Sequence, residues 1–597
     1  MSTSTTPSHS DKLGDTNAII PKSHQHHSNE DFSSSTQNIN PPTPLSRRLL
    51  LATIHASISG LLFGYQLGIT SGALHSLQSS LDLSSSQTES VTSFFFLGLM
   101  IISPFGGEAC DRFGRKKSIL YTDGVFGFAS LVLLSAPSLE VVLAGRFVSG
   151  CASGIGLVSA VSYLTELASG DHSHRGALVS AVEASVSLGF LVSYLTSYLW
   201  MKVVDVEDSW RILFGLGTGF LAFLQWLGMR RMPESPEWLS QMGFHEKANE
   251  ALWWIGGGRT LGIGDAIDND ALAPDMRGSN ADAPNEYQGV SFFALEACPS
   301  ISHYWRQAVI IAFLAIAEQF CGHINIINYA PLIFAEAFFD YDQEQATQDG
   351  GAVASELLTT TIILGVVKFV VTTFVLFEVD KLGRLFLMKA GVGIVTVSLL
   401  LLAIGFSVNL ETTYETEYGV VEYVHSSFQR AMVLIGCTGC VAGFAISYGP
   451  ITWLLASELS PSSIRGRMLG FYTVLTHGSA ALVSYTFLSG QEKYGEAAPF
   501  WLYFLCSIVS CLFIPLAVPE TGDVAGGDGE DVENLLDELW FWGEDNPINS
   551  ATRAVLGCAG RCTKQRSHQR GEEMGRINSC FENGAIDRSE REETEFV

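Results

Sequence analysis

Two short basic loops, each enclosed by apolar runs, constrain the fold of this chain more than any other feature. The first, Asp111-Arg112-Phe113-Gly114-Arg115-Lys116-Lys117, lies between apolar runs at about 91–105 and 119–136. The second is Asp380-Lys381-Leu382-Gly383-Arg384, again between apolar runs. Lys and Arg concentrate in the cytoplasmic loops of membrane proteins, and Asp beside Arg can form a charge-assisted hydrogen bond across helix ends. Two copies of one loop therefore indicate a duplicated membrane protein.

The composition agrees with a protein that crosses a bilayer several times. Of the 597 residues, 47% are hydrophobic and only 16% are charged. Because a spanning helix needs about 20 predominantly apolar residues, this predicts an all-α membrane protein. The net charge of -27 comes largely from soluble segments such as 520–545, and it implies no nucleic-acid partner. The 11 cysteines are scattered and indicate no disulfide framework, and we expect no metal or other cofactor.

The apolar runs predict twelve transmembrane helices in two six-helix halves. They begin near Leu49, Val91, Ile119, Val141, Ala177, Ile212, Ala308, Leu357, Leu385, Ala431, Met468 and Phe500. Basic residues concentrate on one side of these spans, which places both termini in the cytoplasm. An acidic segment at about 411–422 predicts a long outer loop between the ninth and tenth spans.

This pattern divides the chain into five parts. We expect a disordered cytoplasmic tail (1–47), a six-helix half (48–232), a cytoplasmic linker (233–306), a second six-helix half (307–521) and a cytoplasmic C-terminal tail (522–597). The edges of the linker are compatible with short helices. Two six-helix halves suit a transporter that alternates access to a site between them.

The halves also end alike. Glu166 followed by Arg175 ends the fourth span, and Glu458 followed by Arg465 ends the tenth. Pro233-Glu234-Ser235 closes the first half, and Pro519-Glu520-Thr521 closes the second.

Taken together, these landmarks resemble the sugar porters of the major facilitator superfamily. The matching segments are Gly64-Tyr65-Gln66-Leu67-Gly68, the Asp111 loop, Gly145-Arg146-Phe147, Tyr163 with Glu166, Arg175-Gly176, Trp210-Arg211, Pro233-Glu234-Ser235-Pro236, Glu318-Gln319-Phe320, Gly449-Pro450 with Trp453, Arg465-Gly466-Arg467 and Pro519-Glu520-Thr521. Within that family the chain is similar to the class III facilitative glucose transporters, which have a long outer loop between spans nine and ten. Gly322-His323-Ile324-Asn325 and Gly365-Val366-Val367-Lys368 support that branch.

The resemblance implies a gate on the cytoplasmic face. In such proteins, Arg and Glu residues at the ends of the helices form ion pairs that latch the outward-open state. The corresponding residues here are Asp111, Arg112, Arg115, Glu166, Arg175, Glu234, Asp380, Arg384, Glu458, Arg465 and Glu520.

Ionisable residues inside the predicted spans need a reason, because each costs about 2.5–3.5 kcal/mol on insertion scales. They are Arg146, Glu183, Glu318 and Lys368. One interpretation is pairing between helices, for instance Glu318 with Lys368. The other is contact with a hydroxyl-rich substrate, which needs buried donors and acceptors.

The resemblance implies the second interpretation for a set of residues that would bind the substrate: Glu183, Glu318, Gln319, Asn325, Lys368, Trp453 and His477. Trp453 matches the aromatic floor of the sugar site, where a ring face packs against the C–H face of a pyranose. Several pocket positions depart from the family pattern, namely Val161, Val182, Ala445, Thr452, Thr476 and Ala480. The expected cargo is therefore a hexose or a related polyol rather than glucose in particular.

The first and fourth spans bear on energy coupling. Proton-driven relatives carry Asp in the first-span motif, next to the Arg of the fourth span; here that pair is Gln66 and Arg146. An amide does not titrate but can still hydrogen-bond Arg146. This predicts facilitated diffusion, with Glu183 and Glu318 left as substitute coupling sites.

The sequence thus predicts a multi-pass plasma-membrane transporter that moves a hexose or polyol by alternating access. A proton-coupled sugar symporter and a non-transporting sugar sensor remain as alternatives. An enzyme is not expected, because no nucleophile or metal cluster accompanies Glu183 and Glu318. The oligomeric state stays open.

Overall fold

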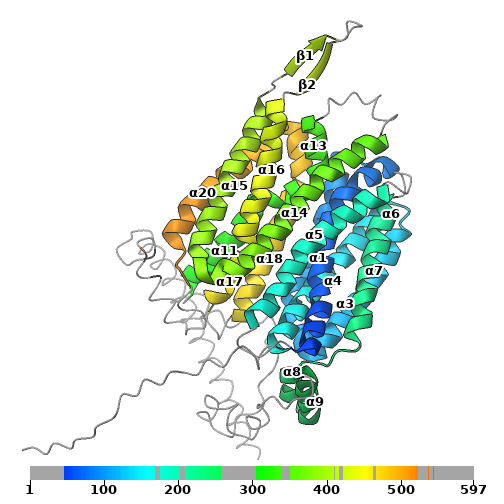
Figure 1. The fold of residues 1–597 in the computed structure, drawn as a ribbon, viewed down its shortest axis with the longest axis vertical. Coiled ribbons are helices and arrows are strands. Elements are labelled where there is room, and N and C mark those ends of the chain that lie inside the picture. The colour runs from blue at the N-terminus through cyan, green and yellow to red at the C-terminus, as the bar shows by residue number, and fades with distance from the viewer. Residues whose placement is uncertain are drawn as a thin grey trace, which may run out of the picture. The chain divides into compact units, whose positions relative to one another are not determined.

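The computed structural model shows a bundle of long helices (Figure 1). It describes residues 46–167, 175–201, 209–256, 304–338, 350–408, 411–415, 421–425, 427–460 and 465–521, with 536, 539 and 542. Nearly all of the predicted N-terminal tail, the centre of the linker and most of the C-terminal tail lie outside these ranges. For Arg175, Asp380 and Arg465 the structure describes the backbone but not the side chain.

The first half contains six spans and two short linker helices. The helices are α1 (Arg47–Leu81), α2 (Ser85–Phe113), α3 (Arg115–Leu134), α4 (Leu139–Leu167), α5 (Arg175–Met201), then α6 (Ser209–Arg211), η2 (Ile212–Gly217) and α7 (Thr218–Met229), followed by α8 (Pro236–Gln241) and α9 (His245–Ile255). The sixth span is thus interrupted by η2, a π-helical turn, a form found mostly as single turns inside α-helices and frequently at functional sites. The short helices α8 and α9 lie at the edge of the linker where the sequence allowed them.

The second half contains longer interruptions. Its elements are α11 (Trp305–Phe320), α12 (His323–Asn328), α13 (Ala330–Phe338), α14 (Gly350–Leu382), α15 (Arg384–Ser407), β1 (Glu411–Glu415), β2 (Val421–His425), α16 (Ser427–Ile446), α17 (Tyr448–Glu458), α18 (Arg465–Tyr485), α19 (Phe487–Tyr494) and α20 (Ala498–Ala517). The strands β1 and β2 pair antiparallel in the long loop between spans nine and ten, where the sequence suggested no strand.

The seventh and tenth spans are broken, whereas the sequence suggested one continuous helix for each. The seventh turns at Gly322, whose φ of 72° lies in the left-handed region that Gly adopts readily. The tenth breaks at Ser447, just before Gly449 and Pro450. Pro has no backbone N–H to donate to the preceding turn, so it favours such a break. Broken helices that meet near the middle of a transporter are typical of its binding site.

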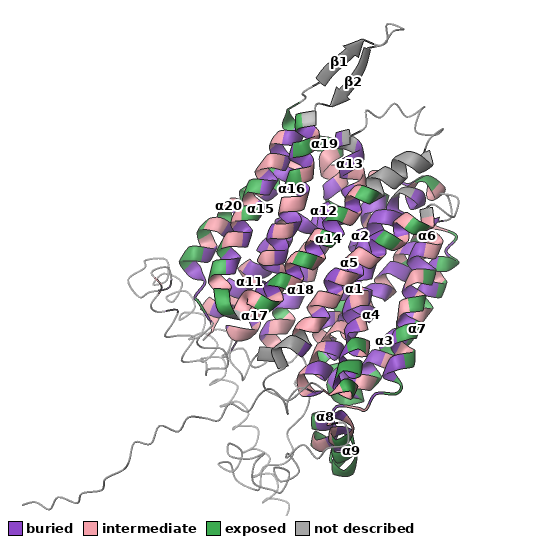
Figure 2. Ribbon diagram, viewed as in Figure 1, coloured by how far each residue is buried: buried purple, intermediate pink, exposed green. Residues whose placement is uncertain are grey.

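Apolar length confirms a helical membrane protein. Within the described residues, eleven spans are long and apolar enough to cross a bilayer. The twelfth is α18, which is long enough but carries many polar side chains. Exposed residues lie mainly along the outer faces of the helices and buried ones between them (Figure 2). Large exposed side chains such as Phe220, Phe374 and Leu505 suit contact with lipid.

Close helix contacts join the two halves. At Gly365 of α14, a Cβ atom would lie 2.8 Å from the Tyr194 ring of α5. At Gly478 of α18, a Cβ atom would lie 3.0 Å from the Met100 sulfur of α2. Small residues let transmembrane helices approach closely, so these two glycines keep the halves in tight contact along α5–α14 and α2–α18.

Candidate functional site

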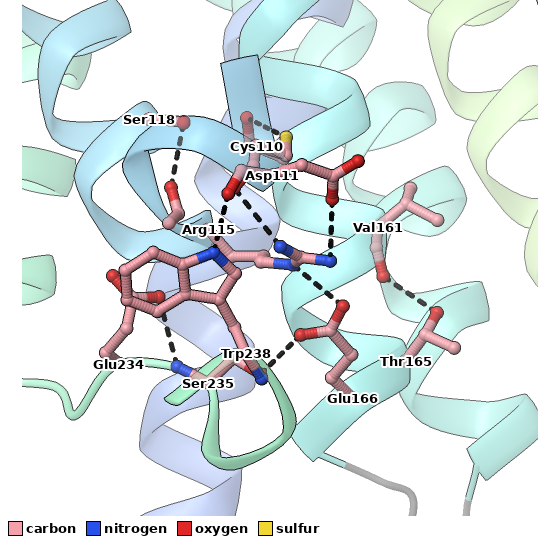
Figure 3. A network of polar contacts seen from close by, with 12 residues as sticks. Cys110, Asp111, Arg115, Ser118, Val161, Thr165, Glu166, Glu234, Ser235 and Trp238 are labelled. Atoms are coloured by element: carbon pink, nitrogen blue, oxygen red, sulfur yellow. Dashed lines mark hydrogen bonds and ion pairs between the residues drawn. The ribbon is translucent and has the colours of Figure 1, made fainter. Parts of the chain in front are cut away.

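The first basic loop forms a charged cluster with the end of α4 (Figure 3). Arg115 Nε lies 2.7 Å from Glu166 Oε1, and its Nη2 lies 3.1 Å from Asp111 Oδ1. Arg115 also donates to the Cys110 carbonyl at 3.2 Å. The other carboxylate oxygen of Glu166 accepts a hydrogen bond from the Ser235 hydroxyl. The arginine therefore joins the loop, the fourth span and the start of the linker.

Glu234 caps the start of α3 next to this cluster. Its Oε1 accepts hydrogen bonds from the backbone N–H of Lys116 at 2.8 Å and of Ser235 at 3.0 Å. The first N–H groups of a helix lack partners within the helix, so a carboxylate there is favourable. Gly114 has a φ of 95°, and a Cβ atom on it would lie 2.7 Å from Glu234 Oε2. Only Gly fits beside this cap.

The second basic loop repeats the main features of this arrangement. Arg384 Nε lies 3.6 Å from Glu458 Oε1, and the Thr521 hydroxyl donates to the other Glu458 oxygen. Glu520 accepts from the backbone N–H groups of Arg384 at 3.1 Å and Leu385 at 2.9 Å. Gly383 has a φ of 84° and a Cβ there would lie 3.3 Å from Glu520 Oε2. The duplication read from the sequence therefore extends to individual hydrogen bonds.

Not every predicted gate residue joins these clusters. Arg112 is exposed and its guanidinium lies 5.7 Å from the centre of the Phe113 ring. Two further contacts were not foreseen: Tyr163 donates to the Pro233 carbonyl at 2.9 Å, and Trp238 Nε1 donates to the Asp111 carbonyl at 2.9 Å.

The expected hydrogen bond between the first and fourth spans is present. Arg146 Nη1 donates to Gln66 Oε1 at 2.7 Å, and Nη2 donates to the Thr70 hydroxyl at 3.0 Å. Both Gln66 and Arg146 are fully buried. The guanidinium also lies 4.7 Å and 4.9 Å from the ring centres of Phe95 and Phe214. A cation over two aromatic rings gains from both, so carbonyls, hydroxyls and rings balance this buried charge.

The π-helical turn in the sixth span packs against the same place. Gln66 Nε2 donates to the Thr218 hydroxyl at 3.0 Å, immediately after η2. Tyr65 donates to the Leu213 carbonyl at 3.1 Å, within η2. Both groups of the Gln66 amide are thus engaged, one as acceptor and one as donor.

Glu318 stands at the break of the seventh span and joins three helices of the second half. Its Oε2 accepts from the Tyr472 hydroxyl at 2.6 Å and from the Thr452 hydroxyl at 2.9 Å. Its Oε1 accepts from Gln319 Nε2 at 3.2 Å. Glu318 and Gln319 belong to α11, Thr452 to the second part of the broken tenth span, and Tyr472 to α18. We call these four residues the Glu318 cluster.

Lys368 of α14 belongs to a second cluster rather than to an ion pair with Glu318. Its Nζ lies 3.1 Å from His323 Nε2 and over the rings of Phe190 and Phe444, at 4.5 Å and 4.9 Å from their centres. The His323 ring stacks on Phe444 with centroids 3.5 Å apart. In the part of the chain that the structure describes, no direct ion pair joins Glu318 to Lys368, although the two charges interact electrostatically. Hydroxyl donors hold the Glu318 carboxylate, and the imidazole of His323 contacts the Lys368 ammonium.

The remaining predicted substrate residues lie at different depths. Glu183 on α5 is half-buried and interacts electrostatically with Lys368. Trp453 is 39% exposed and its ring packs edge-on against Tyr472 at 5.6 Å. His477 is half-buried, with Nδ1 2.8 Å from the Thr473 carbonyl.

Asn325 differs from these residues, because it is fully buried. Its Nδ2 donates to the Val483 carbonyl at 2.9 Å and to the Tyr503 hydroxyl at 2.7 Å. The amide thus joins α12 to α18 and α20, which gives it a place in helix packing.

Several polar residues within the spans escaped the sequence analysis. Glu89 and Asp123 lie inside α2 and α3, yet were not counted among the intramembrane ionisable residues. Glu89 falls just before the predicted start of its span at Val91, so the helix boundary concealed it. The break at Gly322 places His323 at the site, and the packing of α18 against α11 places Tyr472 there.

These features define a class: a multi-pass transporter built from two six-helix halves, with polar clusters at the helix breaks. The profile of the family described as sugar (and other) transporters matches residues 52–525. The chain belongs to this family.

Individual relatives cover most of the chain. It is 28% identical to the solute carrier family 2, facilitated glucose transporter member 12 of Xenopus laevis, over 87% of this chain and 92% of the relative. It is also 28% identical to the arabinose-proton symporter of Escherichia coli strain K12, over 80% and 92%. The inward-open structure of the xylose transporter XylE from E. coli has 25% identity, a TM-score of 0.61, and coverage of 82% of this chain and 100% of that chain.

Proposed function

We propose that this protein carries a hexose or related polyol across the plasma membrane by facilitated diffusion, with both termini in the cytoplasm. The observation that carries the cargo assignment is the Glu318 cluster at the broken helices of the second half. A carboxylate fixed by hydroxyl donors suits a ligand with many hydroxyl groups. Half-buried Glu183 adds a second acceptor from the first half.

Facilitated diffusion rests on Gln66. Its amide holds Arg146 and Thr218 at once, and an amide has no proton to gain or lose in the accessible pH range. The rival is proton coupling through Glu183 or Glu318, which are carboxylic acids near the proposed substrate site. A facilitated glucose transporter and an arabinose-proton symporter match the chain equally well by identity, so the family leaves both modes open.

Uptake into proteoliposomes would distinguish the two modes. We expect the purified protein to take up one or more of a panel of labelled hexoses and polyols, driven only by the gradient of that solute. Adding the transported solute outside should leave the external pH unchanged. The same pH measurement on the Gln66→Asp variant tests whether a carboxylate at this position introduces proton coupling. External alkalinisation by the wild-type protein would contradict facilitated diffusion and make Glu183 or Glu318 the suspected proton carrier. Lack of uptake across the panel would favour a sensor.

A further inference from the structure

A buried carboxylate ties the two halves together at the end of the bundle away from the basic loops. Glu89 lies on the second turn of α2, whose other end carries Asp111. At 1.5 Å per residue, the two ends of this helix are about 40 Å apart. The Glu89 side chain is fully buried, although nothing in the cytoplasmic clusters or the proposed sugar site uses it.

The partners of Glu89 belong to the other half of the molecule. Its Oε1 accepts from the backbone N–H of Ser489 at 2.9 Å, and its Oε2 accepts from the Ser489 hydroxyl at 2.5 Å. Leu488 and Ser489 lie in the first turn of α19, where N–H groups lack helical partners and favour a negative charge. The start of α19 therefore stabilises the Glu89 carboxylate both by hydrogen bonds and by its helix dipole.

Aromatic packing holds α19 in position to receive this carboxylate. Phe487, its first residue, is fully buried and stacks on Tyr329 with centroids 5.2 Å apart. The same ring meets Phe500 of α20 edge-on at 5.8 Å. Because α19 is anchored to the second half, Glu89 cannot keep its hydrogen bonds if α2 moves away from that half.

The contacts described for the clusters of the two basic loops each stay within one half of the molecule. The contacts described for Arg115 join elements of the first half and its linker, and those described for Arg384 join elements of the second half. The Glu89 contact, by contrast, crosses from one half to the other at the opposite end. In a carrier that rocks one half against the other, such a contact stabilises one of the two open states.

We propose that Glu89 and the first turn of α19 form an outer latch that holds the extracellular side closed, so that Glu89 is a positioning residue for the transport cycle. This inference rests on the transport function and orientation proposed above. Opening to the outside must break the hydrogen bonds between Glu89 and Ser489. Removing them should shift the population towards the outward-open state. Such a shift changes the apparent affinity on each side in proportion to the fraction of protein that is open to that side.

Hydrogen–deuterium exchange of the purified protein tests the latch without needing a substrate. In Glu89→Ala, we expect faster exchange in α19 and in the first turns of α2, together with slower exchange at the starts of α3 and α15. The conservative Glu89→Gln variant should shift both in the same directions but less. Lys493→Ala is the matched control, because it removes an exposed charge from the same short helix. Unchanged exchange, or faster exchange at both ends in the two Glu89 variants, would overturn the proposal.

Transport kinetics supply a second readout that a merely structural role would not produce. Glu89→Ala should lower the KM for influx and raise the KM for efflux, each by about threefold or more. The double variant Glu89→Ala with Ser489→Ala should behave like Glu89→Ala alone, because the contact is already lost. Equal changes of KM in both directions would contradict the latch. If wild-type protein moves no sugar, the proposed function fails, while the exchange measurement still decides the latch.

Discussion

Trp453 is the most exposed of the predicted substrate residues. It is 39% exposed, and Tyr472 of the Glu318 cluster supports one edge of it. An indole face can cover the C–H face of a sugar while nearby carboxylates accept from its hydroxyls. Tyr472 contacts both Trp453 and Glu318, so the indole ring and the carboxylate belong to one connected set of side chains.

Replacing Trp453 should weaken sugar binding with little effect on folding. We expect Trp453→Ala to raise the KM or Kd for the transported sugar about tenfold, which corresponds to about 1.4 kcal/mol, and Trp453→Phe to retain part of the affinity. The measurement is uptake or ligand binding by purified variants. Trp501→Ala is the control, since Trp501 is 38% exposed but bonds Ser407 on α15. Unchanged sugar affinity in Trp453→Ala would argue against this placement of the site.

Residue identity predicted some contacts well and others poorly. The hydrogen bond between Gln66 and Arg146 followed from sequence, because a buried guanidinium needs an acceptor and the motif supplied one. The partner of Lys368 did not follow, because charge alone suggested Glu318. Its actual neighbour, His323, depends on the turn at Gly322, and a continuous apolar run gives no sign of how the chain turns there.

At the scale of elements, the paired loops are the most predictable part of the molecule. Charged residues at repeated positions forecast the ion pairs of Arg115 with Glu166 and of Arg384 with Glu458. Glu234 and Glu520 were predicted as gate residues from the repeated motif, whereas their role as N-terminal caps of α3 and α15 depends on backbone geometry. The breaks in the seventh and tenth spans were missed, since hydrophobicity reports the length of a span and not its continuity.

Arg115 and Arg384 should be needed together for transport. Each fixes the start of one helix and the end of another, so their loss frees the helix ends that carry the basic loops in both halves. Arg115→Ala with Arg384→Ala should reduce the maximal uptake rate at least about tenfold, while membrane insertion and the size-exclusion profile stay unchanged. The exposed Arg112→Ala variant serves as the control. Normal uptake by the double variant would show that these clusters do not form a gate.

At the scale of the whole molecule, the fold was available from the spacing of apolar runs and the repeated loops. Six spans in each half follow from both, and the major facilitator fold confirms them. Span ends were less certain: α2 begins at Ser85 and α14 at Gly350, several residues before their predicted starts at Val91 and Leu357. Helices in transporters extend beyond the bilayer, so hydrophobicity underestimates their length.

The orientation gives a further prediction. An N-glycosylation acceptor placed between β1 and β2 should be glycosylated in a eukaryotic host, because that loop is expected outside. The same acceptor placed after α9 should not be modified, because the linker is expected in the cytoplasm. Endoglycosidase-sensitive mobility on a gel would report both. The reverse pattern would invert the orientation and, with it, the face that the outer latch closes.

The polar character of α18 has a consequence for how the protein is made. It is not among the eleven helices that are apolar enough by composition to cross a bilayer, yet it packs against α2 and α11. We therefore infer that its insertion depends on helices synthesised earlier, including one from the first half. Biosynthesis of the second half is then contingent on correct assembly of the first, and damage to α2 should reduce the yield of the entire polypeptide.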